Sequence, residues 1–116
     1  MPQVLGYVTS AERDTFEAYA LDHGLDVTAL ANLLIVRELR AKRLEMLVTT
    51  VEPAPPLTVR AKIVAHTPTE ATKLAFSIRA SEAGMKPSRA AAILFRTELE
   101  ERWLERHVLV NQIDSS

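Results

Sequence analysis

The side chains with the most chemical potential lie in one strand-like segment near the middle of the chain, residues 58–67. Apolar and polar residues alternate along it, which is typical of a strand buried on one face only. Arg60, Lys62 and His66 fall on the polar face. Two cations and an imidazole on one exposed face could contact anionic groups. In an alternative interpretation, Arg60 and Lys62 are solvated charges that keep the strand from pairing with other chains.

Charge is distributed unevenly along the chain. Residues 1–50 contain five Lys/Arg and seven Asp/Glu, a net charge of −2, whereas residues 57–106 contain nine and six, a net charge of +3. The whole chain is close to neutral and therefore does not by itself indicate nucleic-acid binding. Any basic surface must be local, and we expect it in the second half.

Several kinds of chemistry find no support in the sequence. There is no cysteine, and the three histidines are far apart without ligand spacing, so we expect no metal site and no cofactor. The motifs of phosphate-binding loops, dinucleotide sites and serine hydrolases are absent, so we do not expect an enzyme. The start of the chain does not resemble a secretory signal, and no apolar run is long enough for a membrane span. We expect a cytoplasmic protein that does not bind membranes.

The elements that must position the charged face belong to an internal repeat. Residues 9–44 and 69–104 align without a gap, and ten of the 36 aligned positions are identical, where unrelated stretches would share about two or three. The identical pairs are Thr9/Thr69, Ala11/Ala71, Phe16/Phe76, Ala20/Ala80, Gly24/Gly84, Ala31/Ala91, Leu34/Leu94, Glu38/Glu98, Leu39/Leu99 and Leu44/Leu104. The two stretches should therefore form the same structural unit twice.

Each copy is predicted to form a strand, a helix, a glycine turn and a longer helix. In the first copy, Thr9 and Glu12 form a capping box, and the helix ends at Gly24. In the second, a helix begins at residues 67–70, with Glu70 placed for a second capping box, and ends at Gly84.

The longer helices are predicted to begin at N-caps Thr28 and Ser88 and to run to about Leu47 and His107. Glu38 and Lys42 are expected to form an exposed i,i+4 pair. Glu98, Glu101 and Glu105 are expected on a solvated face, whereas Phe95 and Trp103 are expected in the core or at an interface.

A proline-rich linker at residues 51–57 separates the first repeat, residues 1–50, from the second, residues 58–110, and a polar tail follows at 111–116. A lone short strand leaves its backbone groups unpaired, so the strands of the two repeats are expected to pair. We predict a mainly α fold, with an antiparallel two-stranded ribbon over four helices as one globular pseudodimer.

In this arrangement the sequence resembles a tandem ribbon-helix-helix protein. The resemblance covers nearly all of residues 3–106 and rests on Tyr7–Glu12, Phe16, Ala20, Gly24-Leu25, Thr28 and Leu33-Leu34, with Thr69-Glu70, Phe76, Ala80, Gly84-Met85, Ser88 and Ile93-Leu94 in the second copy. Within that superfamily the first copy is most similar to MobC-type relaxosome accessory proteins of mobilisable plasmids. A partition protein, a repressor or an antitoxin would share much of the same pattern.

The resemblance implies that the ribbon enters the major groove of double-stranded DNA and reads base edges. The implied base-reading residues are Arg60, Lys62, His66, Gln3, Leu5 and Tyr7, and the implied phosphate-binding residues are Lys86, Ser88, Arg89 and Thr28. Leu5 on the outward face of the strand could contact only a thymine methyl. Asp26, near the start of the first copy's longer helix, would repel a phosphate. A register shift of one residue, from an extra residue before the second copy's first helix, would exchange the reading and core faces.

The partners that follow from the resemblance are double-stranded DNA and a relaxase or another relaxosome protein. One ribbon spans few base pairs, so a second copy of the chain is expected on an adjacent site. Plasmid mobilisation and transcription regulation are both compatible with it. The competing hypothesis is a protein-interaction scaffold that has lost its DNA-binding face, which the acidic first half and the apolar Leu5 and Tyr7 favour.

Overall fold

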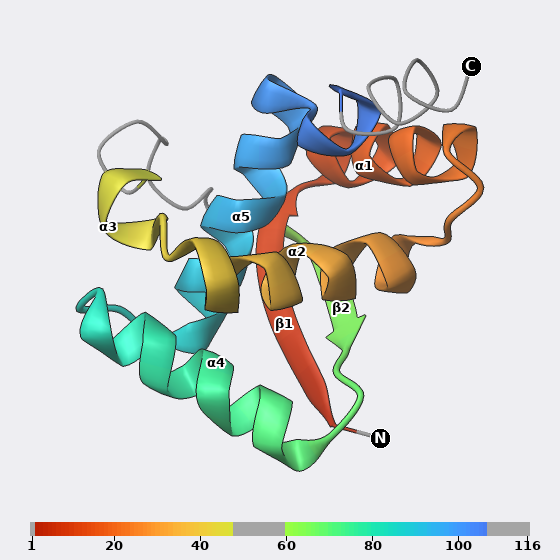
Figure 1. Cartoon of the computed structure of the whole chain (residues 1–116). Helices are drawn as coiled ribbons and strands as arrows, with labels where there is room; N and C mark the ends of the chain where they lie inside the picture. The colour runs from red at the N-terminus through yellow and green to blue at the C-terminus, as the bar shows by residue number, and fades with distance from the viewer. Residues whose placement is uncertain (1, 48–59, 107–116) are drawn as a thin grey trace, which may run out of the picture.

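The computed structural model describes residues 2–47 and 60–106, and the predicted linker and tail lie outside these ranges. Its elements, in chain order, are β1 (Gln3–Thr9), α1 (Ser10–Asp22), α2 (Val27–Ala41), α3 (Leu44–Leu47), β2 (Arg60–His66), α4 (Glu70–Glu82) and α5 (Pro87–Glu101). The structure is mainly helical with one small sheet, which confirms the predicted class (Figure 1). None of the described helices has the length and apolar character that a membrane crossing requires.

The two strands form an antiparallel ribbon, as predicted. Their register runs from the pair Gln3–His66 to the pair Thr9–Arg60. The face turned to the helices carries apolar residues, namely Val4, Gly6, Val8, Ala61, Ile63 and Ala65. Because side chains alternate along a strand, the predicted polar residues share the opposite face. The face assignment made from the sequence is therefore confirmed.

The second repeat does contain an extra residue before its first helix. Thr9 is both the last residue of β1 and the N-cap of α1, whereas Thr67 and Pro68 separate β2 from the N-cap Thr69. The last buried residue before the N-cap is Val8 in one repeat and Thr67 in the other. Aligning these two makes Leu5 equivalent to Val64, so the strand register is symmetric about the Leu5–Val64 pair, as an approximate two-fold relation between the repeats would require.

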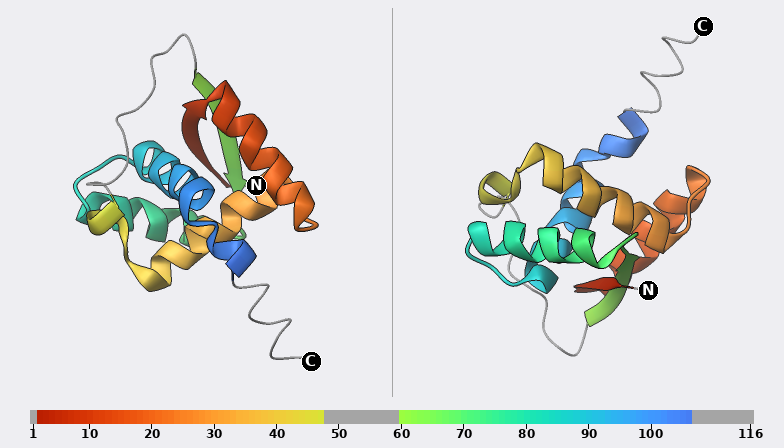
Figure 2. Two further views of the ribbon diagram at one scale, coloured as in Figure 1. Left: turned by 90° about the horizontal axis from the view of Figure 1, so that it is seen from above. Right: turned by 60° about the horizontal axis from the view of Figure 1, so that its bottom comes forward.

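The helices cover one side of the ribbon and leave the other side open, as the right-hand view of Figure 2 shows. Helix α5 packs on β1 and α2 packs on β2. Where α5 crosses β1, Gly6 allows a close approach, because a Cβ there would lie 2.6 Å from the Phe95 ring and 2.9 Å from the Ala92 backbone nitrogen. Phe95 in turn contacts Phe16 of α1, with ring centroids 5.5 Å apart. Phe95 thus lies in the core, as predicted.

The helix starts are partly as predicted. The Thr9–Glu12 capping box is present, with each residue's side chain accepting a hydrogen bond from the other's backbone N–H. The second capping box is wrong, because the N-cap is Thr69 and the residue three positions later is Thr72, which leaves Glu70 at the first helical position. The predicted N-caps of the longer helices are also wrong. The caps are Asp26 and Lys86, two residues before Thr28 and Ser88.

The longer helices end earlier than predicted, at residues with left-handed backbone conformation. Lys42 and Arg102 both have φ of 51°, and a short helical turn follows each. The cause is a buried carboxylate. Glu38 accepts hydrogen bonds from the backbone N–H groups of Arg43 and Leu44, and Glu98 accepts one from Leu104. The expected exposed pair of Glu38 with Lys42 is therefore wrong, as is the solvated position of Glu98, since both glutamates are only 2% exposed.

Candidate nucleic-acid interface

The open face of the ribbon presents four side-chain pairs in a row. They are Gln3–His66, Leu5–Val64, Tyr7–Lys62 and Thr9–Arg60. The four polar residues Gln3, His66, Lys62 and Arg60 are exposed, whereas Leu5, Val64, Tyr7 and Thr9 are half-buried. All six predicted base-reading residues therefore lie together on one surface. This surface, defined by the four pairs, is called the ribbon face below.

Contacts within the ribbon face order its two ends. The Arg60 guanidinium lies over the Tyr7 ring, 5.7 Å from its centroid, in a cation–π arrangement. At the other end, Gln3 Nε2 and His66 Nε2 are 3.2 Å apart, within hydrogen-bond distance. The ribbon face therefore has a cationic end at Arg60 and Lys62 and an amide–imidazole end at Gln3 and His66.

Arg13 is a further cation beside the ribbon that the sequence did not indicate as a site residue. Its Nε donates to the carbonyl oxygen of Lys62 at 3.0 Å, and its Nη1 pairs with Glu17 at 3.1 Å. The side chain thus reaches from α1 to the outer edge of β2. The aligned basic pair Arg13/Lys73 in the repeat was the signal that could have identified it.

The start of α5 combines two cations with an open helix end. Lys86 is the N-cap and makes no side-chain cap hydrogen bond, and Pro87 follows as the first helical residue. Ser88 and Arg89 complete the first turn. First-turn N–H groups have no partner within a helix and carry partial positive charge, so this end is suited to an anion.

The start of α2 is closed by its own carboxylate. Asp26 Oδ1 accepts hydrogen bonds from the Ala29 N–H at 2.7 Å and from the Thr28 hydroxyl at 2.8 Å. These two bonds lower the pKa of the Asp26 carboxyl, and the nearby charge of His66 contributes a smaller part. Asp26 is therefore anionic at neutral pH, and it occupies the place where Lys86 stands in the second repeat.

The four predicted phosphate-binding residues thus fall in two different environments. Lys86, Ser88 and Arg89 lie together at the open end of α5. Thr28 lies apart from them, and its hydroxyl already donates to Asp26. Sequence reasoning missed that Asp26 is the cap that satisfies this helix end.

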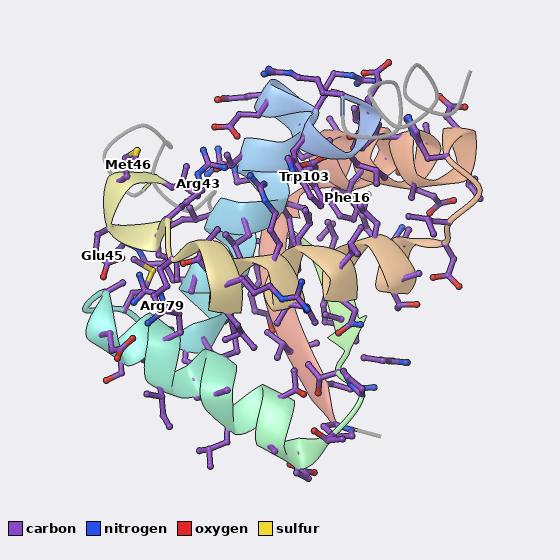
Figure 3. The ribbon with its side chains drawn as sticks, in the orientation of Figure 1. Phe16, Arg43, Glu45, Met46, Arg79 and Trp103 are labelled. Carbon is purple, nitrogen blue, oxygen red and sulfur yellow. The ribbon has the colours of Figure 1, made fainter. Side chains whose placement is uncertain are left out.

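Two buried glutamates hold the helices together at the ends of α2 and α5. Glu38 pairs with Arg79 at 3.2 Å, and Arg79 also contacts Glu82. Arg79 pairs with Glu45 as well, and Figure 3 shows these two residues near each other. Glu98 accepts a hydrogen bond from the Tyr19 hydroxyl at 2.6 Å. Arg79 and Tyr19 occupy aligned positions in the repeat, so each glutamate is bound by the first helix of the other repeat. These cross-repeat contacts tie the two repeats into one body beneath the ribbon.

Metal chemistry has no candidate in this part of the chain. Among residues 2–47 and 60–106, no group of three or more His, Asp or Glu side chains could hold a metal ion.

Trp103, expected in the core or at an interface, packs against the core, and the Arg37 guanidinium lies over its ring, 4.3 Å from the ring centroid.

Comparisons with known proteins identify no relative: no family model, no curated protein and no solved structure matches the chain.

Proposed function

We propose that the chain is a single-chain ribbon-helix-helix pseudodimer that binds double-stranded DNA by inserting the ribbon face into the major groove. The observation that carries this proposal is the antiparallel ribbon with Arg60, Lys62, Gln3 and His66 exposed on the side away from the helices. The major groove is wide enough for a two-stranded ribbon, and side chains of these types can contact base edges. The protein acts by binding and not by catalysis.

Phosphate contacts would come chiefly from the second repeat. Lys86 and Arg89 flank an open helix end that suits a phosphate, whereas Asp26 closes and charges the corresponding end of α2. In the first repeat the Asp26 cap lies near enough to His66 for the imidazole to contribute to the lowered pKa of the Asp26 carboxyl. From the approximate two-fold relation we infer that Lys86 lies beside the Tyr7–Lys62 pair. The cationic end of the ribbon face and the open end of α5 would then contact neighbouring parts of the same DNA backbone.

The resemblance to MobC-type proteins suggests a plasmid transfer origin as the first DNA target, with a role in the relaxosome. An operator, read by a repressor or antitoxin, is the second. The two repeats differ on the ribbon face, so the two halves of the site should differ in sequence, unlike the site of a homodimer. Four side-chain pairs span few base pairs, so two molecules are expected on adjacent sites.

One observation favours a different class of function. Leu5, Val64 and Tyr7 give the ribbon face an apolar middle, which a protein-interaction scaffold could use to bind a relaxase, a toxin or a second copy. The two hypotheses differ in their response to salt. DNA binding releases counterions and weakens steeply between about 50 and about 200 mM salt, whereas a scaffold has no affinity for duplex DNA.

Fluorescence anisotropy with labelled duplex DNA across that salt range tests the proposal. The double variant Arg60→Ala/Lys62→Ala should weaken binding to a preferred site by about tenfold or more, because a good side-chain–base contact is worth ~1–3 kcal/mol. A matched control, Arg40→Ala/Arg106→Ala, removes two exposed cations outside the ribbon face and should weaken it less. Equal effects of the two variants would contradict insertion of the ribbon, and no DNA binding at low salt would exclude the function.

A further inference from the structure

The apolar pair in the middle of the ribbon face is the feature that DNA binding in general does not explain. Leu5 and Val64 are directly paired and face away from the helices. The strand register is symmetric about them, with Tyr7–Lys62 on one side and Gln3–His66 on the other. A face that served only to contact phosphates would carry polar side chains here.

Aliphatic side chains can make only one favourable contact in the major groove. They neither donate nor accept hydrogen bonds, so covering a base edge with them leaves donors and acceptors unpaired. Among the four ordinary bases only thymine presents a methyl group in this groove, and apolar side chains contact that methyl. Cytosine methylated at C5 presents a methyl group at the equivalent position.

The ribbon geometry fixes where such a contact would fall. Alternate residues of an antiparallel strand are about 6.8 Å apart, which matches the rise of about two base pairs along DNA. If the ribbon follows the groove, neighbouring pairs on the ribbon face meet bases about two steps apart. The Leu5–Val64 pair therefore meets the centre of the site, and the polar pairs meet its flanks.

We propose that Leu5 and Val64 read the C5-methyl groups of pyrimidines, thymine or 5-methylcytosine, at the centre of the DNA site. This inference rests on the proposed insertion of the ribbon into the major groove and adds the chemical group that the ribbon selects. Lys62 and Arg60 on one flank offer donors that suit guanine, and Gln3 on the other offers an amide that suits adenine. The preferred site should thus contain thymine at its centre and different bases on its two sides.

The test uses the full chain and two sets of duplexes. A preferred site is first selected from a random duplex library, and each thymine is then replaced by deoxyuridine, which lacks only the methyl group. Replacement of a central thymine should weaken binding about fourfold, which corresponds to the ~0.8 kcal/mol of one buried methyl-sized group. Replacement of a flanking thymine should have no such effect. A central cytosine should bind more tightly when it is methylated at C5.

The variant Leu5→Ala/Val64→Ala should bind thymine and deoxyuridine duplexes equally while keeping the salt dependence of the unmodified protein. Leu74→Ala, which truncates a 61% exposed leucine on α4, is the matched control and should keep the fourfold preference. Because the deoxyuridine comparison uses the unmodified protein, it does not depend on how the variants fold. A library that yields no preferred site, or a site bound equally with and without its central methyl groups, would overturn this inference but not salt-dependent DNA binding. If the unmodified protein bound no duplex at low salt, the proposed function itself would be overturned.

Discussion

The two repeats use the same buried glutamate with different partners. Glu38 is bound by the Arg79 guanidinium, whereas Glu98 is bound by the Tyr19 hydroxyl at the aligned position. Glu38 thus takes part in a buried ion pair, whereas Glu98 accepts a hydrogen bond from a neutral hydroxyl. The glutamate itself is retained because it binds the backbone N–H groups that follow the left-handed residues Lys42 and Arg102. The buried glutamate is therefore the same in both repeats, whereas the side chain that binds it differs.

The surfaces have diverged further than the core. The start of α2 is closed by the anionic Asp26, and the start of α5 is open and flanked by Lys86 and Arg89. At these two helix starts, the second repeat carries two cations and the first carries a carboxylate. A chain that carries both repeats can change one half without changing the other, which a symmetric homodimer cannot do.

The largest expected effect comes from breaking the ion pair. Arg79→Ala leaves Glu38 buried and without its cationic partner, so the free energy of unfolding should fall by ~3–5 kcal/mol. Urea unfolding followed by circular dichroism measures this. The control is Arg13→Ala, which removes a part-exposed arginine paired with Glu17 and should cost ~1 kcal/mol or less. Equal losses in the two variants would mean that the buried pair does not hold the repeats together.

The next effect tests the close approach of α5 to β1. Gly6→Ala would bring a Cβ within 2.9 Å of the backbone nitrogen of Ala92. Because this backbone atom cannot rotate away, the free energy of unfolding should fall by ~1–3 kcal/mol. The equivalent position in the second repeat, Ala65, already carries a Cβ against α2. If Gly6→Ala left the melting temperature unchanged, α5 would lie no closer to the ribbon than α2 does.

The Tyr19–Glu98 contact predicts that the free energy of unfolding depends on pH in the alkaline range. Burial and the hydrogen bond to Glu98 raise the pKa of Tyr19 above the ordinary value of about 10. Because the folded-state pKa is the higher one, the stabilisation is complete below pH 10 and is lost as the pH rises above it, by up to ~1.4 kcal/mol per pH unit. Tyr19→Phe should lack this part of the alkaline destabilisation, whereas the control Tyr7→Phe should keep it. Identical unfolding profiles of the two variants between about pH 10 and pH 12 would argue against the Tyr19–Glu98 contact.

The smallest effect concerns the two helix starts. Asp26→Ser keeps a capping side chain but removes the negative charge, so duplex DNA should bind up to about fivefold more tightly, because one like charge is removed from the helix end. The reciprocal change Lys86→Ser should weaken binding by a similar factor. Anisotropy titrations at low salt measure both. Unchanged binding in both variants would show that the difference between the two helix starts has no bearing on DNA binding, and weaker binding by Asp26→Ser would contradict repulsion by its carboxylate.

The parts of the fold that follow from short-range patterns could be predicted from the sequence. Alternation in residues 58–67 gave the ribbon face, and the Thr9–Glu12 spacing gave the capping box, because both depend on neighbours a few positions away. Glu38 and Glu98 could not be placed, since a glutamate at helical spacing has the pattern of an exposed residue. Their burial depends on Arg79 and Tyr19, which come from the other repeat.

The predicted caps of the longer helices are wrong for a different reason. Thr28 and Asp26 are both good N-cap residues, and only the backbone geometry shows that Asp26 accepts the N–H while Thr28 lies inside the helix. Arg13 was missed because its role depends on the edge of β2, far away in the chain. A contact between the repeats decides the case of Arg13, whereas local backbone geometry decides the helix caps.

The most direct measurement is a titration of isotopically labelled protein with duplex DNA, followed through the backbone amide resonances. Insertion of the ribbon face predicts the largest shifts in β1, β2 and the start of α5 around residues 86–89, with smaller shifts at Asp26 and little change in α3. Shifts confined to the α3 end, or none at low salt, would contradict the assignment of the ribbon face as the DNA-binding surface.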